Sequence, residues 1–119
     1  MIGCDPSIMG VGPIYAVRRL LERTGLSVDE IDVVEINEAF SCQVLTCLRE
    51  LGIETDLPFK KTNLWGGAIA LGHPLGESGA RIIVTLNSIM KNEKTEAKYG
   101  LATLCGGFGN ANASLWERC

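Results

Sequence analysis

Residues 66–81 read Gly-Gly-Ala-Ile-Ala-Leu-Gly-His-Pro-Leu-Gly-Glu-Ser-Gly-Ala-Arg and contain His73, the only histidine of the chain. Five glycines and one proline surround this ring, just before a run that is typical of a helix. Such a composition favours a pocket lined by backbone over a packed apolar core. Because imidazole changes charge near neutral pH, a histidine at the mouth of that pocket is a candidate acid or base. Taken alone, a single histidine is more often an ordinary surface or core residue.

The segments on either side of this stretch predict a loop and a helix. Residues 53–76 have little periodicity and many turn-forming residues, so we expect one long loop with a functional role. A helix is expected from residues 76–78 onward, because apolar side chains recur there at helical spacing. Its inward-facing residues would be Ala80, Ile83, Val84, Asn87 and Met90.

The residues before this stretch alternate between helix and strand patterns. Pro13 suits the first turn of a helix, and Gly25 suits its C-terminal end. The β-branched residues of 31–36 predict a short strand. A second helix is expected from residue 38 or 41 to residue 51, with an apolar stripe formed by Phe40, Val44, Leu45, Leu48 and Leu51.

The residues after it predict a C-terminal antiparallel hairpin. Its strands would be residues 99–105 and 110–116, joined by the glycine-rich turn 106–109. Helices that alternate with buried strands indicate the α/β class, with helices packed on a mixed, mostly parallel sheet. The 119 residues fit one domain, which would bury roughly 65% of the surface of the unfolded chain.

Composition and charge exclude several classes of function. Apolar residues make up 46% of the chain and charged residues 21%, as in ordinary globular proteins. The net charge is −3 and no basic cluster exceeds a pair, so we expect no nucleic-acid partner. No apolar run approaches the roughly 18 residues of a membrane span, so we expect no membrane partner. The first residues lack the pattern of a signal peptide, which favours a cytoplasmic protein.

The five cysteines are expected to be reduced thiols without a metal. They form no Cys-x-x-Cys pair, and a single histidine cannot complete a zinc site with suitable spacing. Cys42 and Cys47 lie five positions apart in the expected second helix, where we expect them to be buried or half-buried. At least one of the thiols could be chemically active, and the spacing does not indicate which.

Three short motifs lie at strand ends or helix starts, where α/β folds collect functional residues. They are Asn37-Glu38-Ala39-Phe40, the segment around His73, and Cys105-Gly106-Gly107-Phe108-Gly109. Each also has a structural interpretation: Asn37 could cap the following helix, and Cys105 could be a small buried apolar residue. We expect Glu38 to be structural or to support the site, and Arg81 to face solvent or to pair locally.

The order of these motifs resembles the C-terminal half of a thiolase. The resemblance includes Asn-Glu-Ala-Phe at 37–40, the block at 66–81 and the Cys-x-Gly-x-Gly pattern that begins at Cys105. The opening Asp-Pro-Ser-Ile-Met-Gly-Val-Gly-Pro at 5–13 also resembles the beginning of that half. The resemblance covers nearly the whole chain, and the block at 66–81 is its most specific part.

The resemblance implies an acyltransferase that makes or cleaves 3-ketoacyl-CoA, with coenzyme A thioesters as substrates and no further cofactor. Cys105 matches the family's acid/base cysteine, which removes a proton from the α-carbon of an acyl-CoA or returns one. A lowered or matched thiol pKa would suit this role, and a neighbouring imidazole and backbone dipoles could provide it.

The remaining matches imply two oxyanion holes. His73 matches a histidine that helps to activate the nucleophile and donates to the thioester oxygen, and Asn37 matches an asparagine that holds a water beside it. Gly107 matches a glycine whose N–H serves the second oxyanion hole, where only glycine permits a close backbone approach. Ala39 and Phe40 would line the wall near the pantetheine end of the substrate.

The family's nucleophilic cysteine belongs to its N-terminal half, and no stretch of this chain matches that motif. We therefore expect residues 1–119 to be a thiolase C-terminal domain with a truncated first strand. It would be inactive alone, would expose an apolar face, and would act with an N-terminal half in a homo-oligomer.

Two alternatives stay open. The sequence Gly-Phe-Gly-Asn at 107–110 faintly resembles the ketoacyl synthases of the same superfold, which condense through a decarboxylation. The other alternative is a non-catalytic domain that only assembles with a partner.

Overall fold

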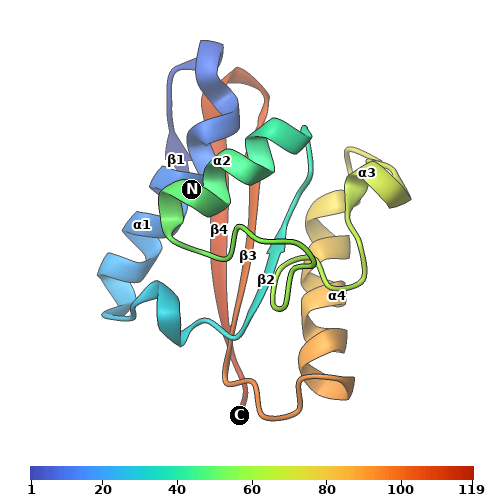
Figure 1. Cartoon of the computed structure of the whole chain (residues 1–119). Coiled ribbons are helices and arrows are strands. Elements are labelled where there is room, and N and C mark those ends of the chain that lie inside the picture. Colours follow the sequence, from blue (N-terminus) through green and yellow to red (C-terminus); the bar gives the residue numbers. More distant parts are fainter.

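In a computed structural model that describes residues 1–119, a four-stranded sheet lies between two helices on one face and one helix on the other (Figure 1). The strand order is β1-β4-β3-β2. Strand β2 (Val33–Ile36) runs parallel to β3 (Tyr99–Gly106), whereas β4 (Asn110–Glu117) is antiparallel to β3 and to β1 (Ile2–Gly3). The α/β class, the mixed sheet and the hairpin are confirmed. The prediction that most neighbouring strands are parallel is wrong. Only β2 and β3, which a crossover connects, are parallel, and the other two strand pairs are antiparallel.

Helices α1 (Gly12–Thr24) and α2 (Ser41–Leu51) cover the first face of the sheet. Pro13 lies in the first turn of α1, as predicted, and glycines in the left-handed region end both helices, Gly25 with φ 72° and Gly52 with φ 69°. Short 3₁₀ turns precede or join these elements at η1 (Pro6–Val11), η2 (Val28–Glu30) and η3 (Gly107–Gly109). The first core consists of Ile14, Val17, Ile31, Val34, Ile36, Val44, Cys47, Leu48, Leu51, Ile53 and Leu101.

Helix α4 (Ser78–Asn92) covers the opposite face, but its inward-facing residues differ from the prediction. The buried residues are Ser78, Ile82, Leu86, Ile89 and Met90. Of the predicted residues, Met90 is therefore confirmed, and Ile83 is partly buried against this core. Val84 is 63% exposed. Apolar residues occur around most of this helix, so two stripes at helical spacing compete, and packing against β2 and β3 selects one of them.

The predicted stripe of α2 is also partly wrong. Gln43 and Cys47 are buried, whereas Leu45 is exposed and Phe40 lies just before the helix with 60% of its surface exposed. Cys42 is exposed, contrary to the expectation for this thiol. A polar residue occupies the inner face because Gln43 accepts a hydrogen bond from the backbone N–H of Ala39, at 3.1 Å.

The segment 53–76 is more ordered than a plain loop. It contains the short helix α3 (Ala68–Leu71), and Thr62 forms an isolated parallel bridge with Val34 of β2. The Glu54 carboxylate accepts three backbone N–H bonds from residues 60–62, at 2.7 to 2.8 Å. Burial acts to raise the pKa of this carboxylate, but the hydrogen bonds together outweigh burial and lower the pKa. A single helical turn is too short to produce periodicity in sequence, which explains why α3 was missed.

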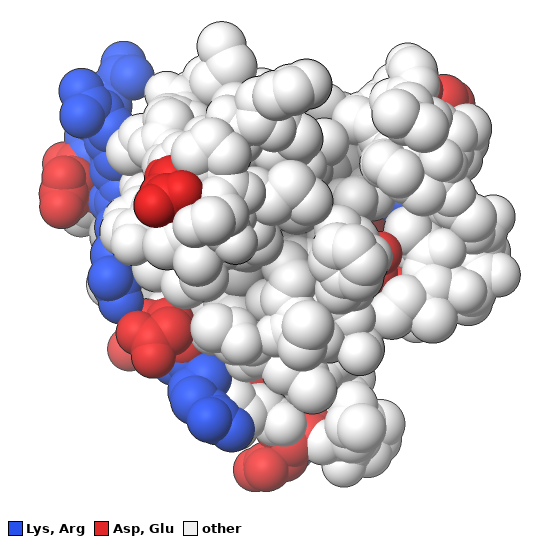
Figure 2. All heavy atoms as spheres, turned by 90° about the horizontal axis from the view of Figure 1, so that it is seen from above, with Lys and Arg blue, Asp and Glu red and all other residues white.

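None of the helices combines the length and the apolar character that crossing a membrane would need. The parallel strands β2 and β3 both run upward in Figure 1, where β3 continues to the top of the molecule. Seen from above, this face is almost free of charged residues, which gather along one edge (Figure 2). Large apolar side chains of the three motif segments and their neighbours are exposed, among them Phe40, Ile69 and Leu75.

Candidate active site

A cleft of about 560 Å³ opens at the carboxyl ends of β2 and β3. All six residues predicted for the site line it: Asn37, Ala39, Phe40, His73, Cys105 and Gly107. In Figure 2 a groove separates the lobe formed by α3 and the start of α4 from the rest of the chain. The tertiary structure thus brings together three motifs that are separated by more than 30 residues in sequence.

Cys105 lies near the end of β3, opposite Ala111 of β4. Its side chain is only 7% exposed. Burial raises the pKa of this thiol and the nearby Cys4 thiol adds to the rise, while a backbone hydrogen bond acts in the opposite direction. The expectation of a lowered or matched pKa is therefore wrong for this chain, because desolvation outweighs the backbone contribution. A buried thiol of this kind stays protonated near neutral pH and can donate a proton.

The turn after Cys105 is shaped by its glycines and by Asn110. Gly109 has φ 74°, and a Cβ at this position would collide with the backbone carbonyl of Cys4. The Asn110 side chain donates a hydrogen bond to the carbonyl of Gly107 at 2.6 Å, which holds the orientation of that peptide. A Cβ on Gly107 itself would meet no atom of the chain within 4 Å. Nothing within the chain therefore requires glycine there, and a reason for glycine would have to come from a bound molecule or another segment.

His73 is presented by a left-handed glycine and held by a serine. It follows Gly72, which has φ 93°, and its Nδ1 lies 2.8 Å from the Oγ of Ser78. The Ser78 hydroxyl is buried and donates to the carbonyl of Pro74 at 3.2 Å. When the serine proton is directed there, the serine oxygen can accept from Nδ1–H, and this is the tautomer that leaves Nε2 unprotonated.

Asn37 follows β2 directly and does not cap α2. Its backbone N–H donates to the carbonyl of Thr103 at 2.9 Å, which continues the pairing of β2 with β3. The residue is 1% exposed, and its Oδ1 has no hydrogen-bond partner within the chain. Buried acceptors are rarely left unpaired, so an unpaired oxygen beside a cleft is a suitable site for a bound water.

The Glu35 carboxylate and the Arg81 guanidinium are buried polar groups that do not line the cleft. Glu35 is 1% exposed, and neither of its carboxylate oxygens has a partner. Burial raises its pKa to about 8, although the Arg81 guanidinium has the opposite effect. The three guanidinium nitrogens of Arg81 are buried without partners, so the expectation that this side chain faces solvent or pairs locally is wrong.

Several residues of the site were not predicted from the sequence. Met9, Ile69 and Leu75 add apolar lining to the cleft. Ser78 could have been found, since it is the polar residue in the first turn of the helix after His73. Asn63 contacts residues 25 to 27 positions away, and no local pattern indicates this. No three His, Cys, Asp or Glu side chains come together as a metal site would require.

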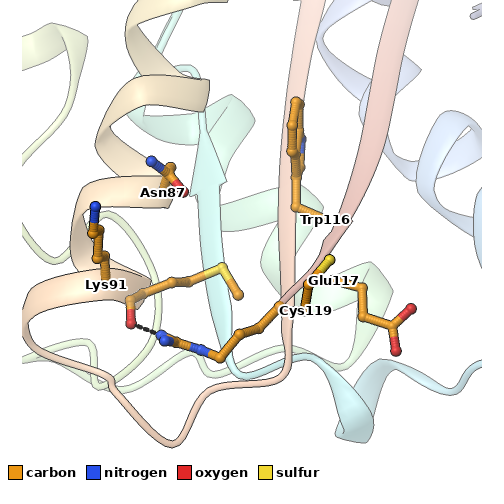
Figure 3. A pocket seen from close by; sticks show the side chains of 7 residues that line it. Asn87, Lys91, Trp116, Glu117 and Cys119 are labelled. Atoms are coloured by element: carbon orange, nitrogen blue, oxygen red, sulfur yellow. Dashed lines mark hydrogen bonds between the residues drawn. The ribbon is translucent and has the colours of Figure 1, made fainter.

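A second cavity, of about 350 Å³, lies at the opposite end of the molecule (Figure 3). Asn87 and Lys91 of α4 line one side, and the end of β4 lines the other. Arg118 donates to the carbonyls of Met90 and Ala97, so this cation fastens the C-terminal strand to α4. None of the motif residues reaches this cavity.

Comparison with known proteins agrees with the geometry. A family model described as thiolase, C-terminal domain, matches residues 1–118. The chain is 56% identical over 116 residues to a 3-ketoacyl-CoA thiolase of Vibrio vulnificus (strain YJ016), covering 98% of this chain and 29% of that protein. It is 52% identical over 118 residues to a 3-ketoacyl-CoA thiolase of Enterobacter sp. (strain 638), covering 99% of this chain and 30% of that protein.

The chain thus spans slightly less than a third of the length of these curated relatives. The match extends over nearly all of its residues, from β1 to the end of β4, and includes every segment that lines the cleft. The family model and these relatives favour the thiolase interpretation over the ketoacyl synthase alternative. On this match the chain belongs to the thiolase family and corresponds to its C-terminal domain.

Proposed function

We propose that this chain is the catalytic C-terminal domain of a 3-ketoacyl-CoA thiolase, which transfers acyl groups between coenzyme A thioesters. The observation that carries the proposal is the cleft at the ends of β2 and β3, where all six predicted site residues meet. The relatives are named 3-ketoacyl-CoA thiolases, and the proposed substrate class, a 3-ketoacyl-CoA, follows from that name.

Cys105 is the proton carrier in this proposal. In thiolysis, the nucleophilic cysteine thiolate bonds to the β-carbon, the bond between the α- and β-carbons breaks, and its electron pair forms the enolate of acetyl-CoA, while the acyl group stays on that cysteine as a thioester. The Cys105 thiol protonates the α-carbon of this enolate. The resulting Cys105 thiolate then accepts the proton of the attacking coenzyme A thiol, whose sulfur takes the acyl group, and the nucleophilic cysteine leaves and regains its proton from the imidazolium of His73. Since burial raises the pKa of Cys105, its protonated form suits the first of these two steps.

His73 and Asn37 form the first oxyanion hole. The Ser78 hydroxyl orients the imidazole, whose Nε2 accepts the proton of the nucleophilic thiol and afterwards donates to the thioester oxygen. A water held by the Asn37 side chain donates to the same oxygen, and the backbone N–H of Gly107 serves the second oxyanion hole. Removal of one such donor typically raises the barrier by about 3 to 4 kcal/mol. Ala39 and Phe40 contact the pantetheine arm.

The nucleophilic cysteine comes from the part of the enzyme that these 119 residues do not include. Large apolar side chains around the cleft are exposed, among them Phe40, Ile69, Leu75 and Phe108, which suits a face that another part of the protein covers. We propose a cytoplasmic homo-oligomer that needs no metal and no cofactor besides its coenzyme A substrates.

The test is a chimeric enzyme in which this chain replaces the matching 116-residue segment of the Vibrio vulnificus relative. We expect thiolysis of acetoacetyl-CoA by the chimeric enzyme and none by the chain alone. Cys105→Ala and His73→Ala should each lower kcat by at least about a hundredfold. Cys119→Ala, which removes an exposed thiol outside the cleft, should keep the rate of the unsubstituted chimera.

Two results would contradict the proposal. One is a folded chimeric enzyme in which Cys105→Ala retains the full rate. The other is an inert chain that binds the separately expressed remainder of the relative tightly while the mixture shows no thiolysis. The second result would support the non-catalytic assembly domain instead.

A further inference from the structure

Glu38 lies between the two segments that carry Asn37 and His73. It follows Asn37 directly in the chain. Its Oε1 accepts a hydrogen bond from the Asn63 side-chain amide at 2.9 Å, and its Oε2 accepts one from the backbone N–H of Ile69 at 2.9 Å. One carboxylate therefore joins the end of β2 to the long segment that leads to the histidine.

Asn63 is itself anchored at the end of β2. Its Oδ1 accepts from the backbone N–H of Ile36 at 2.9 Å, and its Nδ2 donates to the carbonyl of the same residue at 2.9 Å. The side-chain amide thus pairs with Ile36 as a neighbouring strand would. Asn63 adopts a left-handed conformation with φ 45°, which asparagine tolerates better than most residues.

The second contact of Glu38 fixes helix α3. The N–H of Ile69 belongs to the first turn of this helix, where amides have no partner within the helix. Helix α3 ends at Gly72, and His73 follows immediately. A Cβ on Gly67 would collide with the Glu38 carboxylate, so glycine at this position allows the close approach.

We propose that Glu38 and Asn63 are positioning residues that set the location of His73 relative to Asn37. Asn37 is the residue before Glu38 in the chain. His73 is connected to Glu38 through helix α3, whose Ile69 N–H donates to the Glu38 carboxylate. The contact of His73 with Ser78 orients the ring, whereas the Glu38 link locates the backbone that carries it. This inference rests on the proposed function, in which both side chains act on the same thioester oxygen.

A small displacement of His73 would have a large effect on the reaction. Misplacing a catalytic group by about 1 Å can lower a rate by about a hundredfold. The link contributes no contact to the substrate, so its loss should lower kcat and leave KM nearly unchanged. Glu38→Gln keeps one acceptor oxygen and should fall between the wild-type protein and Glu38→Ala.

The first experiment uses the 119-residue chain and does not depend on activity. In Glu38→Ala, the Ile69 amide should exchange with deuterium about 10- to 100-fold faster, because a charge-assisted hydrogen bond is lost. The NMR signals of the ring of His73, the only histidine, should shift or broaden. Glu22→Ala removes an exposed carboxylate from α1 that makes no hydrogen bond, and should change neither signal.

Gly67→Ala is a second way to break the hydrogen bonds of Glu38, because the new methyl group would displace the Glu38 carboxylate. Its matched control is Gly79→Ala in α4, where a Cβ meets no atom within 4 Å. Gly67→Ala should reproduce the exchange and NMR changes of Glu38→Ala, and Gly79→Ala should not.

The second experiment measures thiolysis kinetics in the chimeric enzyme. Glu38→Ala should lower kcat by about a hundredfold and change KM by less than about threefold. Unchanged Ile69 exchange and unchanged His73 signals in folded Glu38→Ala would show that Glu38 does not hold helix α3 and His73 in place. Altered exchange with an unchanged kcat would overturn its positioning role. An inactive unsubstituted chimera would count against the proposed function, while the exchange and ring signals would still decide whether Glu38 positions His73.

Discussion

Glu35 should make the stability of this chain fall as the pH rises. Its pKa is raised from 4.5 to about 8, mainly by burial, and Glu38 adds to the rise while Arg81 opposes it. The unfolded chain releases this proton near its ordinary pKa, but the folded chain keeps it up to about pH 8. Between these two values the folded state binds more protons than the unfolded state. The free energy of unfolding must therefore decrease with pH across this window.

The size of the effect follows from the two pKa values. Each unit of difference corresponds to about 1.4 kcal/mol, so the full window gives a loss of up to about 5 kcal/mol. The stabilisation is complete below pH 4.5 and is lost as the pH rises through about 8. The lowered pKa of Glu54 acts with the opposite sign and at lower pH, because that carboxylate must be protonated on acidification. The two effects are therefore separated along the pH axis.

The substitution Glu35→Gln tests this reasoning. Glutamine resembles the protonated carboxyl but cannot ionise, so its variant should match the wild-type stability near pH 5 and exceed it near pH 8. Urea unfolding followed by circular dichroism at pH 5, 6, 7 and 8 gives the comparison. Glu22→Gln, on the exposed side of α1, should keep the wild-type dependence. A wild-type stability that stays level from pH 5 to 8, or an equal slope in Glu35→Gln, would refute the reasoning.

Three further outcomes follow from local contacts. Cys42 is exposed and should react rapidly with a thiol reagent at pH 8. Burial raises the pKa of Cys47 to about 11, so this thiol should stay unreactive until the chain unfolds. Equal reaction rates of the two thiols, measured by mass spectrometry, would contradict this. Gly12→Ala should lower the free energy of unfolding by about 1 to 3 kcal/mol, because the new Cβ would lie 2.7 Å from a side-chain methyl on β4; a thermal midpoint at the wild-type value would argue against that crowding. Ser78→Ala removes the partner of Nδ1 in His73 and should mix the two neutral ring tautomers, which ring nitrogen chemical shifts measure; unchanged shifts would show that the serine does not select the tautomer.

Local sequence signals were sufficient for most of the elements. Pro13 and Gly25 bracket α1, Gly52 ends α2, and the glycines after β3 form the turn of the hairpin, because each of these residues restricts or frees the backbone at its own position. The three functional motifs were also visible, since they resemble a known family. Their roles stay predictions, but the residues themselves could be named without coordinates.

The sequence by itself determined the order of the three longer helices, of β2 and of the hairpin strands, the glycines that end α1 and α2, and the motif residues, which all depend on interactions between near neighbours in the chain. Only the tertiary structure decided which face of α4 is buried, how the strands are ordered, and that Glu38, Asn63 and Ile69 meet. Burial likewise raised the pKa of Cys105, although the role implied by the family resemblance suggested a lowered or matched one. These properties arise from contacts between residues far apart in sequence, and packing selects among patterns that are locally equivalent.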